Sequence, residues 1–248
     1  AMFIAVAVTI INVVNPVIVL IGVSIGAVIG SLIALRVKMT SIPEMVALFN
    51  GFGGLATFFI AWSEFNAIPD NVFQFIVIML TTYIGGVTFS GSIIAYGKLS
   101  EKLKVKKDSF VTKIFTTFFY ASILFLVYSI GFTEIIELPI NFYTVLLILT
   151  LLGGIGFVIP IGGGDMPVVI SLLNSFSGIA AAFAGLLLLN NVLIVAGSLV
   201  GASGLILTII MAKAMNRSIG NILFVGYASS SSSSGSQETG EVKPINVA

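Results

Sequence analysis

Long apolar runs separated by short polar breaks dominate this chain. Because about 20 apolar residues are needed to span a bilayer, we expect eight membrane-crossing helices, the first of them partial. The expected spans are 2–11, 17–35, 43–63, 72–97, 110–132, 142–160, 167–189 and 192–213. The pattern therefore predicts an all-α polytopic membrane protein whose transmembrane domain occupies residues 1–226. A serine- and glycine-rich stretch follows, and we expect residues 227–248 to form a linker.

The composition agrees with this class and narrows the chemistry. The 248 residues are 58% hydrophobic and 8% charged, which leaves too little polar surface for a water-soluble globule. The chain has no Cys and no His, so it lacks thiol chemistry, the usual proton shuttle and the commonest metal ligand. We expect no metal site and no nucleic-acid partner.

The basic residues fall on alternate connections between the expected spans. The opposite connections carry only acids, which are Glu64, Asp70, Glu134 and Glu137. The positive-inside rule then places the basic side and the C-terminus in the cytoplasm, or in the matrix of an organelle. We expect the plasma membrane of a prokaryote. The bases on one side are Arg36, Lys38, Lys98, Lys102, Lys104, Lys106, Lys107, Lys113, Lys213 and Arg217.

An internal repeat relates the two halves of the domain. PEMVALFNGFGGLATFFIA (43–61) and PVVISLLNSFSGIAAAFAG (167–185) align without gaps, and the following helices carry Ser90-Gly91 and Ser203-Gly204. Both copies start on the basic side, which predicts a parallel repeat of four plus four helices. Chance similarity of apolar segments is the alternative, but lipid does not dictate matched Pro, Asn and Gly. The matched pairs are Pro43/Pro167, Leu48/Leu172, Asn50/Asn174, Phe52/Phe176, Gly54/Gly178, Ala56/Ala180 and Phe59/Phe183.

Three polar residues from three spans share one depth. Asn50 and Asn174 lie seven residues past their prolines, roughly 10 Å below the basic surface at 1.5 Å per residue. Ser92 lies roughly 8 Å below the same surface. Such groups either join helices by hydrogen bonds of about 1 kcal/mol each or line a proton or ion path. The layer alone favours the first interpretation.

Glycines mark a loop and two helix contacts. Asp165 follows Gly162–Gly164 and precedes Pro167, so it fits either a helix N-cap or a contact with a partner domain. We reject a phosphate loop, because no Lys-Ser/Thr follows and no strand precedes. Close backbone packing is expected at two glycine runs: Gly22, Gly26 and Gly30, and Gly197 and Gly201.

Several longer strings then point to a family. GGVTFSGSIIAYGKL (85–99), IGGGDMPVV (161–169), AMNRS (214–218) and MTSIPEMVA (39–47) resemble the membrane domain of proton-translocating nicotinamide nucleotide transhydrogenase, beta-subunit type. The resemblance runs in order from about residue 17 to 226. GEVKP (240–244) resembles the opening of that family's NADP(H)-binding domain.

The resemblance implies an enzyme that couples proton translocation to hydride transfer between NADH and NADP⁺. It places NAD(H) and NADP(H) on soluble partner domains, so that this chain itself binds no cofactor. It also implies a dimeric complex with further membrane helices in the lipid bilayer. Residue by residue, Ser92, Asn174 and Gly204 match positions implicated in proton passage or coupling. Asp165 and Arg217 match positions at which the membrane domain communicates with the NADP(H) domain.

Two features depart from the family pattern. Many bacterial relatives carry a His where this chain has Asn50, so the titrating group is expected elsewhere or is replaced by a water chain. The loop 99–113 lacks the proline-rich pattern of the family. With the resemblance, we interpret Asn50, Ser92 and Asn174 as a proton path. The alternatives are a secondary transporter or ion channel for a small solute, and a membrane anchor.

Overall fold

The computed structural model describes residues 16–67, 69, 71–103, 110–131 and 140–228, and every regular element in that part is helical. Six of these helices are long and apolar enough to cross a membrane, which confirms the all-α polytopic class. The helices are α2 (Pro16–Arg36), α3 (Ile42–Asn66), α4 (Val72–Leu99), α5 (Phe110–Gly131), α6 (Ile140–Val158), α7 (Met166–Leu187), α8 (Asn191–Ala214) and α9 (Ile219–Ala228).

The expected spans agree closely with these helices. Each span from 17–35 onward begins and ends within three residues of a helix from α2 to α8. The run 2–11 lies outside the described residues, as does 229–248 of the expected linker. The apolar helix α9 was not expected, because its 10 residues are too few to cross a bilayer.

Polar side chains and backbone turns fix the helix ends. Asn71 and Asn190 cap α4 and α8, accepting hydrogen bonds from the backbone N–H of Gln74 at 2.8 Å and Leu193 at 3.1 Å. Positive φ angles close α4, α7 and α8 in the left-handed region that commonly ends helices. They occur at Glu101 (φ 55°), Leu189 (φ 50°) and Asn216 (φ 53°).

The chain divides into two compact units, residues 1–42 and 43–248. The first contains α2, which is largely apolar and ends in Arg36, and the short 3₁₀ helix Met39–Ser41. The close backbone packing expected at Gly22, Gly26 and Gly30 stays a prediction. The second unit contains α3 to α9, and the description that follows concerns it alone.

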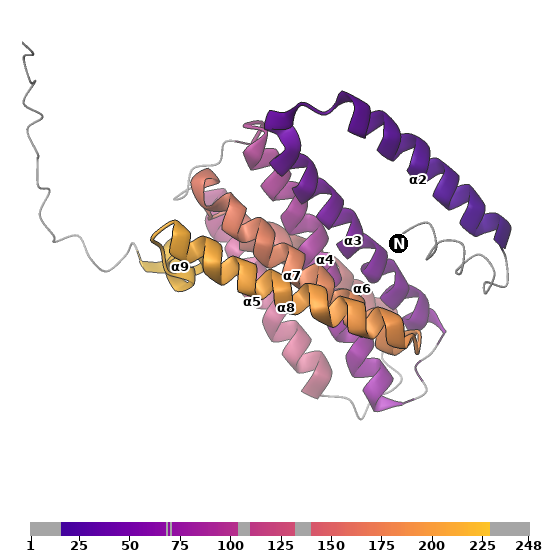
Figure 1. The fold of residues 1–248 in the computed structure, drawn as a ribbon. Helices are drawn as coiled ribbons and strands as arrows, with labels where there is room; N and C mark the ends of the chain where they lie inside the picture. The colour runs from indigo at the N-terminus through magenta and orange to yellow at the C-terminus, as the bar shows by residue number, and fades with distance from the viewer. Residues whose placement is uncertain (1–15, 68, 70, 104–109, 132–139, 229–248) are drawn as a thin grey trace, which may run out of the picture. The chain divides into compact units, whose positions relative to one another are not determined.

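Glycines let neighbouring helices in the second unit approach backbone to backbone. Figure 1 shows α7 and α8 running side by side, and α3 packs on α4 in the same way. A Cβ added at Gly85 would lie 2.9 Å from the Gly54 carbonyl oxygen, and one added at Gly197 would lie 2.8 Å from the Gly178 carbonyl oxygen. Matched positions of the repeat thus make matched helix contacts. The close packing expected at Gly197 and Gly201 is confirmed.

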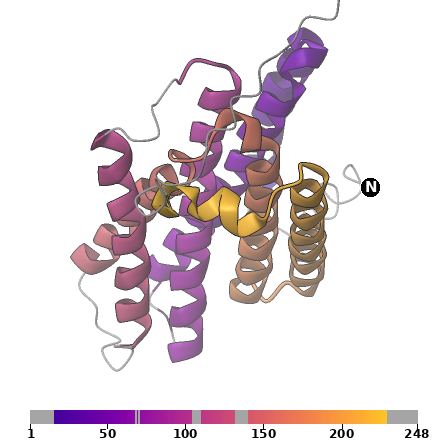
Figure 2. The same cartoon turned by 90° about the vertical axis from the view of Figure 1, so that its left-hand side faces the viewer.

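Two apolar clusters fill the two ends of this helix bundle. Lys98, Lys213 and Arg217 lie at the end that we call the basic end. The basic-end cluster includes Ile222 of α9, which runs across the direction of α7 and α8 in Figure 2. Its other buried members are Ala47, Ala95, Val158, Ile161, Met166, Val168, Val169, Ile170, Leu173 and Ala212. The cluster at the opposite end is Ala61, Phe75, Val77, Ile78, Met79, Leu126, Tyr143, Leu146 and Leu187.

Candidate functional site

A hydrogen-bonded polar group joins α3, α4 and α7 between these two clusters. The Asn50 side chain donates from Nδ2 to Ser92 Oγ at 3.2 Å and accepts at Oδ1 from Ser177 Oγ at 2.7 Å. Ser92 is fully buried, while Asn50 and Ser177 are half-buried. The structure therefore brings together two of the three residues of the expected layer. We call Asn50, Ser92 and Ser177 the Asn50 group.

Ser177 was missed in the sequence analysis. Its hydroxyl lies 2.7 Å from Asn50 Oδ1 and 2.8 Å from the Asn174 backbone carbonyl oxygen, and it is placed to donate to both. A serine hydroxyl carries one proton, so the two acceptors must share it. The available signal was its position three residues after Asn174, which is one helical turn further along the same face.

Asn174 joins the Asn50 group only through its backbone. Its side chain is half-buried and makes no hydrogen bond with the described residues. The two asparagines of the repeat therefore differ, because Asn50 forms two side-chain hydrogen bonds and Asn174 forms none in this part of the chain. An amide with unused donors and acceptors is suited to holding water.

Next to the Asn50 group the two repeat copies exchange a glycine and a serine. In the first copy Gly51 faces Ser92, and a Cβ added at Gly51 would lie 3.0 Å from Ser92 Cβ. In the second copy Ser175 faces Gly204, where an added Cβ would lie 2.8 Å from Ser175 Cα. By these contacts Gly204 corresponds to Ser92. The sequence alignment of Ser203-Gly204 with Ser90-Gly91 matched it instead with the preceding residue, Gly91. Gly204 thus lies in a helix contact and is not joined to Asp165 or Arg217.

Other buried hydroxyls in the bundle serve mainly their own helices. Thr57 donates to the Gly54 carbonyl, Thr88 to Ile84 and Ser90 to Gly86. Such bonds satisfy the hydroxyl without linking helices. Ser171 and Thr208 join α7 to α8 at 3.0 Å, a link between two helices only. The Asn50 group differs because one side chain contacts two other helices at once.

Apolar packing separates the Asn50 group from the basic end. Ala47 and Ala95 lie three residues beyond Asn50 and Ser92 in that direction and are 1% and 0% exposed. Leu173 and Met166 of α7 pack in the same cluster and are fully buried. The apolar cluster therefore covers the Asn50 group on the side of the basic end.

An ion pair lies at the basic end. Arg217 Nη1 donates to Asp165 Oδ2 at 3.1 Å, joining the turn after α8 to the residue before α7. Asp165 occupies the N-cap position of α7, but its side chain makes no capping hydrogen bond. The N-cap interpretation therefore holds for its position only. The Asp165 and Arg217 side chains are 17% and 51% exposed, so both remain accessible.

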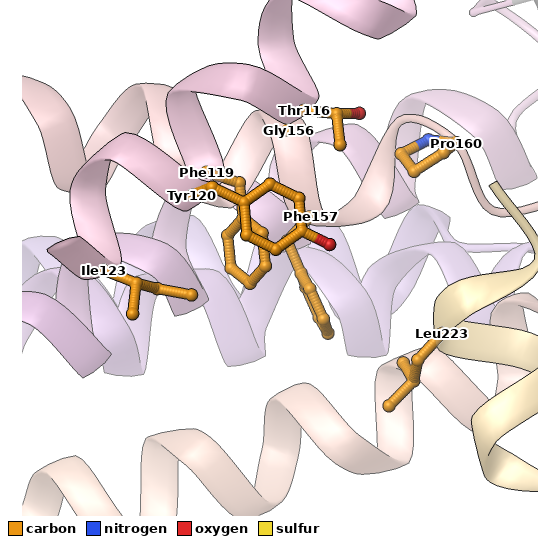
Figure 3. A pocket seen from close by; sticks show the side chains of 8 residues that line it. All are labelled: Thr116, Phe119, Tyr120, Ile123, Gly156, Phe157, Pro160 and Leu223. Carbon is orange, nitrogen blue, oxygen red and sulfur yellow. The ribbon is translucent and has the colours of Figure 1, made fainter. Parts of the chain in front are cut away.

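A separate cavity of about 190 Å³ lies between α5, α6 and α9. Figure 3 shows the side chains of Phe119, Tyr120 and Phe157 in the middle of it and Leu223 on its α9 side. Its lining is largely apolar and contains no charged residue, so it offers no charge to hold a nucleotide. Nor do the described residues contain a group of acids that could hold a metal ion. The residues that line the cavity are Thr116, Phe119, Tyr120, Ile123, Gly156, Phe157, Pro160 and Leu223.

These features define a helical integral membrane protein with a polar group that joins three helices beneath an apolar cluster at the basic end. Over residues 1–248 the sequence matches the family described as NAD(P) transhydrogenase beta subunit. The chain belongs to that family, which confirms the resemblance read from its motifs. The match supports the transhydrogenase interpretation and not the transporter alternative.

Two curated relatives bear the same description. Both are named NAD(P) transhydrogenase subunit beta, one from Rhodospirillum rubrum and one from a specified strain of that species. Each is 38% identical over 221 residues, which cover 85% of this chain. The chain spans about half the length of these relatives, at 47%.

Proposed function

We propose that this chain is the proton-conducting membrane part of an NAD(P)⁺ transhydrogenase. The complete enzyme would couple proton translocation to hydride transfer between NADH and NADP⁺. Family membership supports the activity. The Asn50 group supports the location of the path, because it places polar groups from three helices together inside an apolar bundle. Polar groups inside a membrane domain are costly and commonly mark such paths.

The path works by hydrogen-bond exchange and not by a titrating side chain within the Asn50 group. Asn50 offers one acceptor and one donor, and the Ser92 and Ser177 hydroxyls can each donate and accept. The Asn174 side chain, which has no hydrogen-bond partner among the described residues, holds water beside them. The titrating group then lies on another part of the complex, or a chain of waters replaces it. Water movement through the path requires the basic-end cluster to open.

The coupling partners meet the basic end. We assign NAD(H) and NADP(H) to soluble partner domains, as membership of the transhydrogenase family implies. Asp165 is partly exposed and Arg217 is exposed at that end, so both are placed to contact the NADP(H) domain. Gly204 supports coupling by keeping α8 close to Ser175. The complex is a dimer in a prokaryotic plasma membrane, with the basic end and the C-terminus cytoplasmic.

Reconstitution of the full-length complex in vesicles tests this function. Internal pH is followed while NADH reduces an NADP⁺ analogue. We expect proton flux in step with hydride transfer, and we expect Asn174→Leu to reduce that flux at least tenfold. Ser198→Ala is the matched control, because Ser198 is an exposed α8 residue that donates only to Ile194 of its own helix. Hydride transfer by the parent complex without proton flux, or Asn174→Leu behaving like the control, would overturn the proposal.

A further inference from the structure

Lys98 makes an unusual set of contacts in the last turn of α4. Its ammonium donates to the backbone carbonyl oxygens of Val158 at 3.2 Å, Ile159 at 2.5 Å and Ile161 at 2.6 Å. An ammonium has three protons, so this set uses every one of them. Lys98 is half-buried, and within the described part of the chain it pairs with no carboxylate. A charge used only for topology would extend into water instead.

The three acceptors lie where α6 ends. The last carbonyls of a helix lack partners within it and carry the negative end of its dipole. Pro160 lies among the three acceptors and stops the helix. Lys98 therefore supplies the α6 terminus with hydrogen bonds and positive charge from a different helix.

The same backbone carries part of the basic-end cluster. Val158 is 0% and Ile161 4% exposed, and both belong to the apolar packing that covers the Asn50 group. Ile161 also begins the loop that leads through Gly162–Gly164 to Asp165. Lys98 thus binds the cover and the loop to α4, the helix that carries Ser92 six residues earlier.

We propose that Lys98 is a positioning residue that keeps the basic-end cluster closed over the Asn50 group. Its hydrogen bonds hold the α6 terminus against α4, and their release lets water reach Ser92 from the basic side. The role of this closure in coupling rests on the proposed function, but the closure itself does not.

These 248 residues contain no Cys, so a single introduced Cys can report on closure once any cysteine elsewhere in the complex is replaced. Ser92→Cys in the full-length complex provides a buried reporter close in size to the native residue. Its rate of reaction with a small, water-soluble maleimide is measured in the absence of nucleotides, in membrane fragments that leave both faces accessible to the reagent. Lys98→Met is expected to raise this rate at least tenfold, and Lys98→Gln is expected to raise it less. Lys98→Arg, which keeps the charge and several donors, should stay within about threefold of the parent.

Two controls separate closure from general loosening. Lys213→Met removes the corresponding basic residue from the last turn of α8, where the side chain is exposed, and should leave the rate unchanged. Ser122→Cys reports on a buried site of α5 outside the basic-end cluster and should stay unreactive in Lys98→Met. An unchanged rate at Ser92→Cys in Lys98→Met would overturn the proposal. So would equal gains at Ser122→Cys, because Lys98 would then support the whole fold.

Failure of the proposed function gives a different result. If the Asn50 group conducts no protons, the vesicle experiment fails while the labelling pattern remains. If the expected labelling pattern is absent, the proposal for Lys98 is wrong, but the vesicle experiment can still support the proton path. Where both hold, Lys98→Met should also lower the number of protons moved per hydride at least threefold, with Lys98→Arg close to the parent.

Discussion

At the scale of single residues, the Asn50 group is notable for sharing one proton between two acceptors. Asn50 Oδ1 and the Asn174 carbonyl oxygen both lie within hydrogen-bond distance of the Ser177 hydroxyl. A small change in nearby water can therefore shift the Ser177 hydroxyl proton from one of these acceptors to the other. The arrangement suits a path in which hydrogen bonds must break and reform.

Ser177→Ala tests the contribution of this hydroxyl to stability. The change leaves Asn50 Oδ1 without a donor, so we expect a loss of about 1 kcal/mol in the free energy of unfolding. Unfolding in detergent by a denaturing surfactant measures it. Ser203→Ala is the control, since Ser203 is exposed and donates only to Val200 of its own helix. Equal stability of the two variants would argue against the Asn50 group as a helix junction.

At the scale of helices, the repeat keeps one contact geometry with exchanged residues. Gly51 against Ser92 in α3 and α4 corresponds to Ser175 against Gly204 in α7 and α8. One partner is a glycine in each copy, so the helix separation is kept. In the first copy the serine of this contact, Ser92, accepts a hydrogen bond from Asn50, whereas in the second copy Ser175 donates to the Gly201 carbonyl at 2.7 Å.

Exchanging the residues of the first copy separates packing from hydrogen bonding. Gly51→Ser alone places a Cβ 3.0 Å from that of Ser92, and we expect it to destabilise the protein by 1–3 kcal/mol, roughly the cost of overpacking. Combined with Ser92→Gly, it should recover most of that stability, because it copies the second repeat. Proton flux should stay low in the double variant, since Asn50 loses its acceptor. Recovery of flux together with stability would show that only packing matters here.

The ion pair at the basic end is expected to act in coupling and not in stability. Exposed pairs contribute about 0–1 kcal/mol, so Asp165→Asn should shift the melting temperature by less than about 4 °C. Hydride transfer by the complex should nevertheless fall severalfold. Exchanging the charges, with Asp165→Arg and Arg217→Asp together, should not restore it if both residues meet a partner domain. Full restoration would confine their role to this chain.

The sequence could predict the helices and part of the site. Helix length and rise place Asn50 and Ser92 at one depth without any knowledge of packing. Ser177 was missed because its role depends on how α7 is rotated toward α3. The contacts of Lys98 were also missed, because its acceptors lie 60 to 63 residues away along the chain. From sequence alone, a basic residue at the end of a span indicates only which side of the membrane it faces. The short helix α9 was not predicted, because its 10 residues are too few to cross a bilayer and its packing against the basic-end cluster is not visible in the sequence.

At the scale of the whole molecule, the contacts bring a basic residue at the end of α4 and another after α8 to the same loop before α7. Lys98 reaches the loop before α7, and Arg217 after α8 pairs with Asp165 in the same loop. The ends of α4 and α8 and the start of α7 therefore share one end of the second unit. This is the arrangement that the alternating charge pattern predicts.

Single cysteines test which side of the membrane this end faces. Leu189→Cys and Ala214→Cys lie in exposed positions at opposite ends of α8, and the chain contains no other cysteine. An impermeant maleimide applied to intact cells should label Leu189→Cys and not Ala214→Cys. Inverted membrane vesicles should reverse the pattern. The opposite pattern would contradict the assignment of the basic end to the cytoplasm.

The most direct test of the proton path is the response of hydride transfer to an imposed pH difference. The full-length complex is reconstituted in vesicles, and the rate of NADP⁺ analogue reduction by NADH is compared with and without that difference. We predict a severalfold change of rate in the parent and in Ser198→Ala, and no response in Asn50→Leu, which should still transfer hydride when the pH is equal on both sides. A response in Asn50→Leu as large as that of the parent would contradict the account.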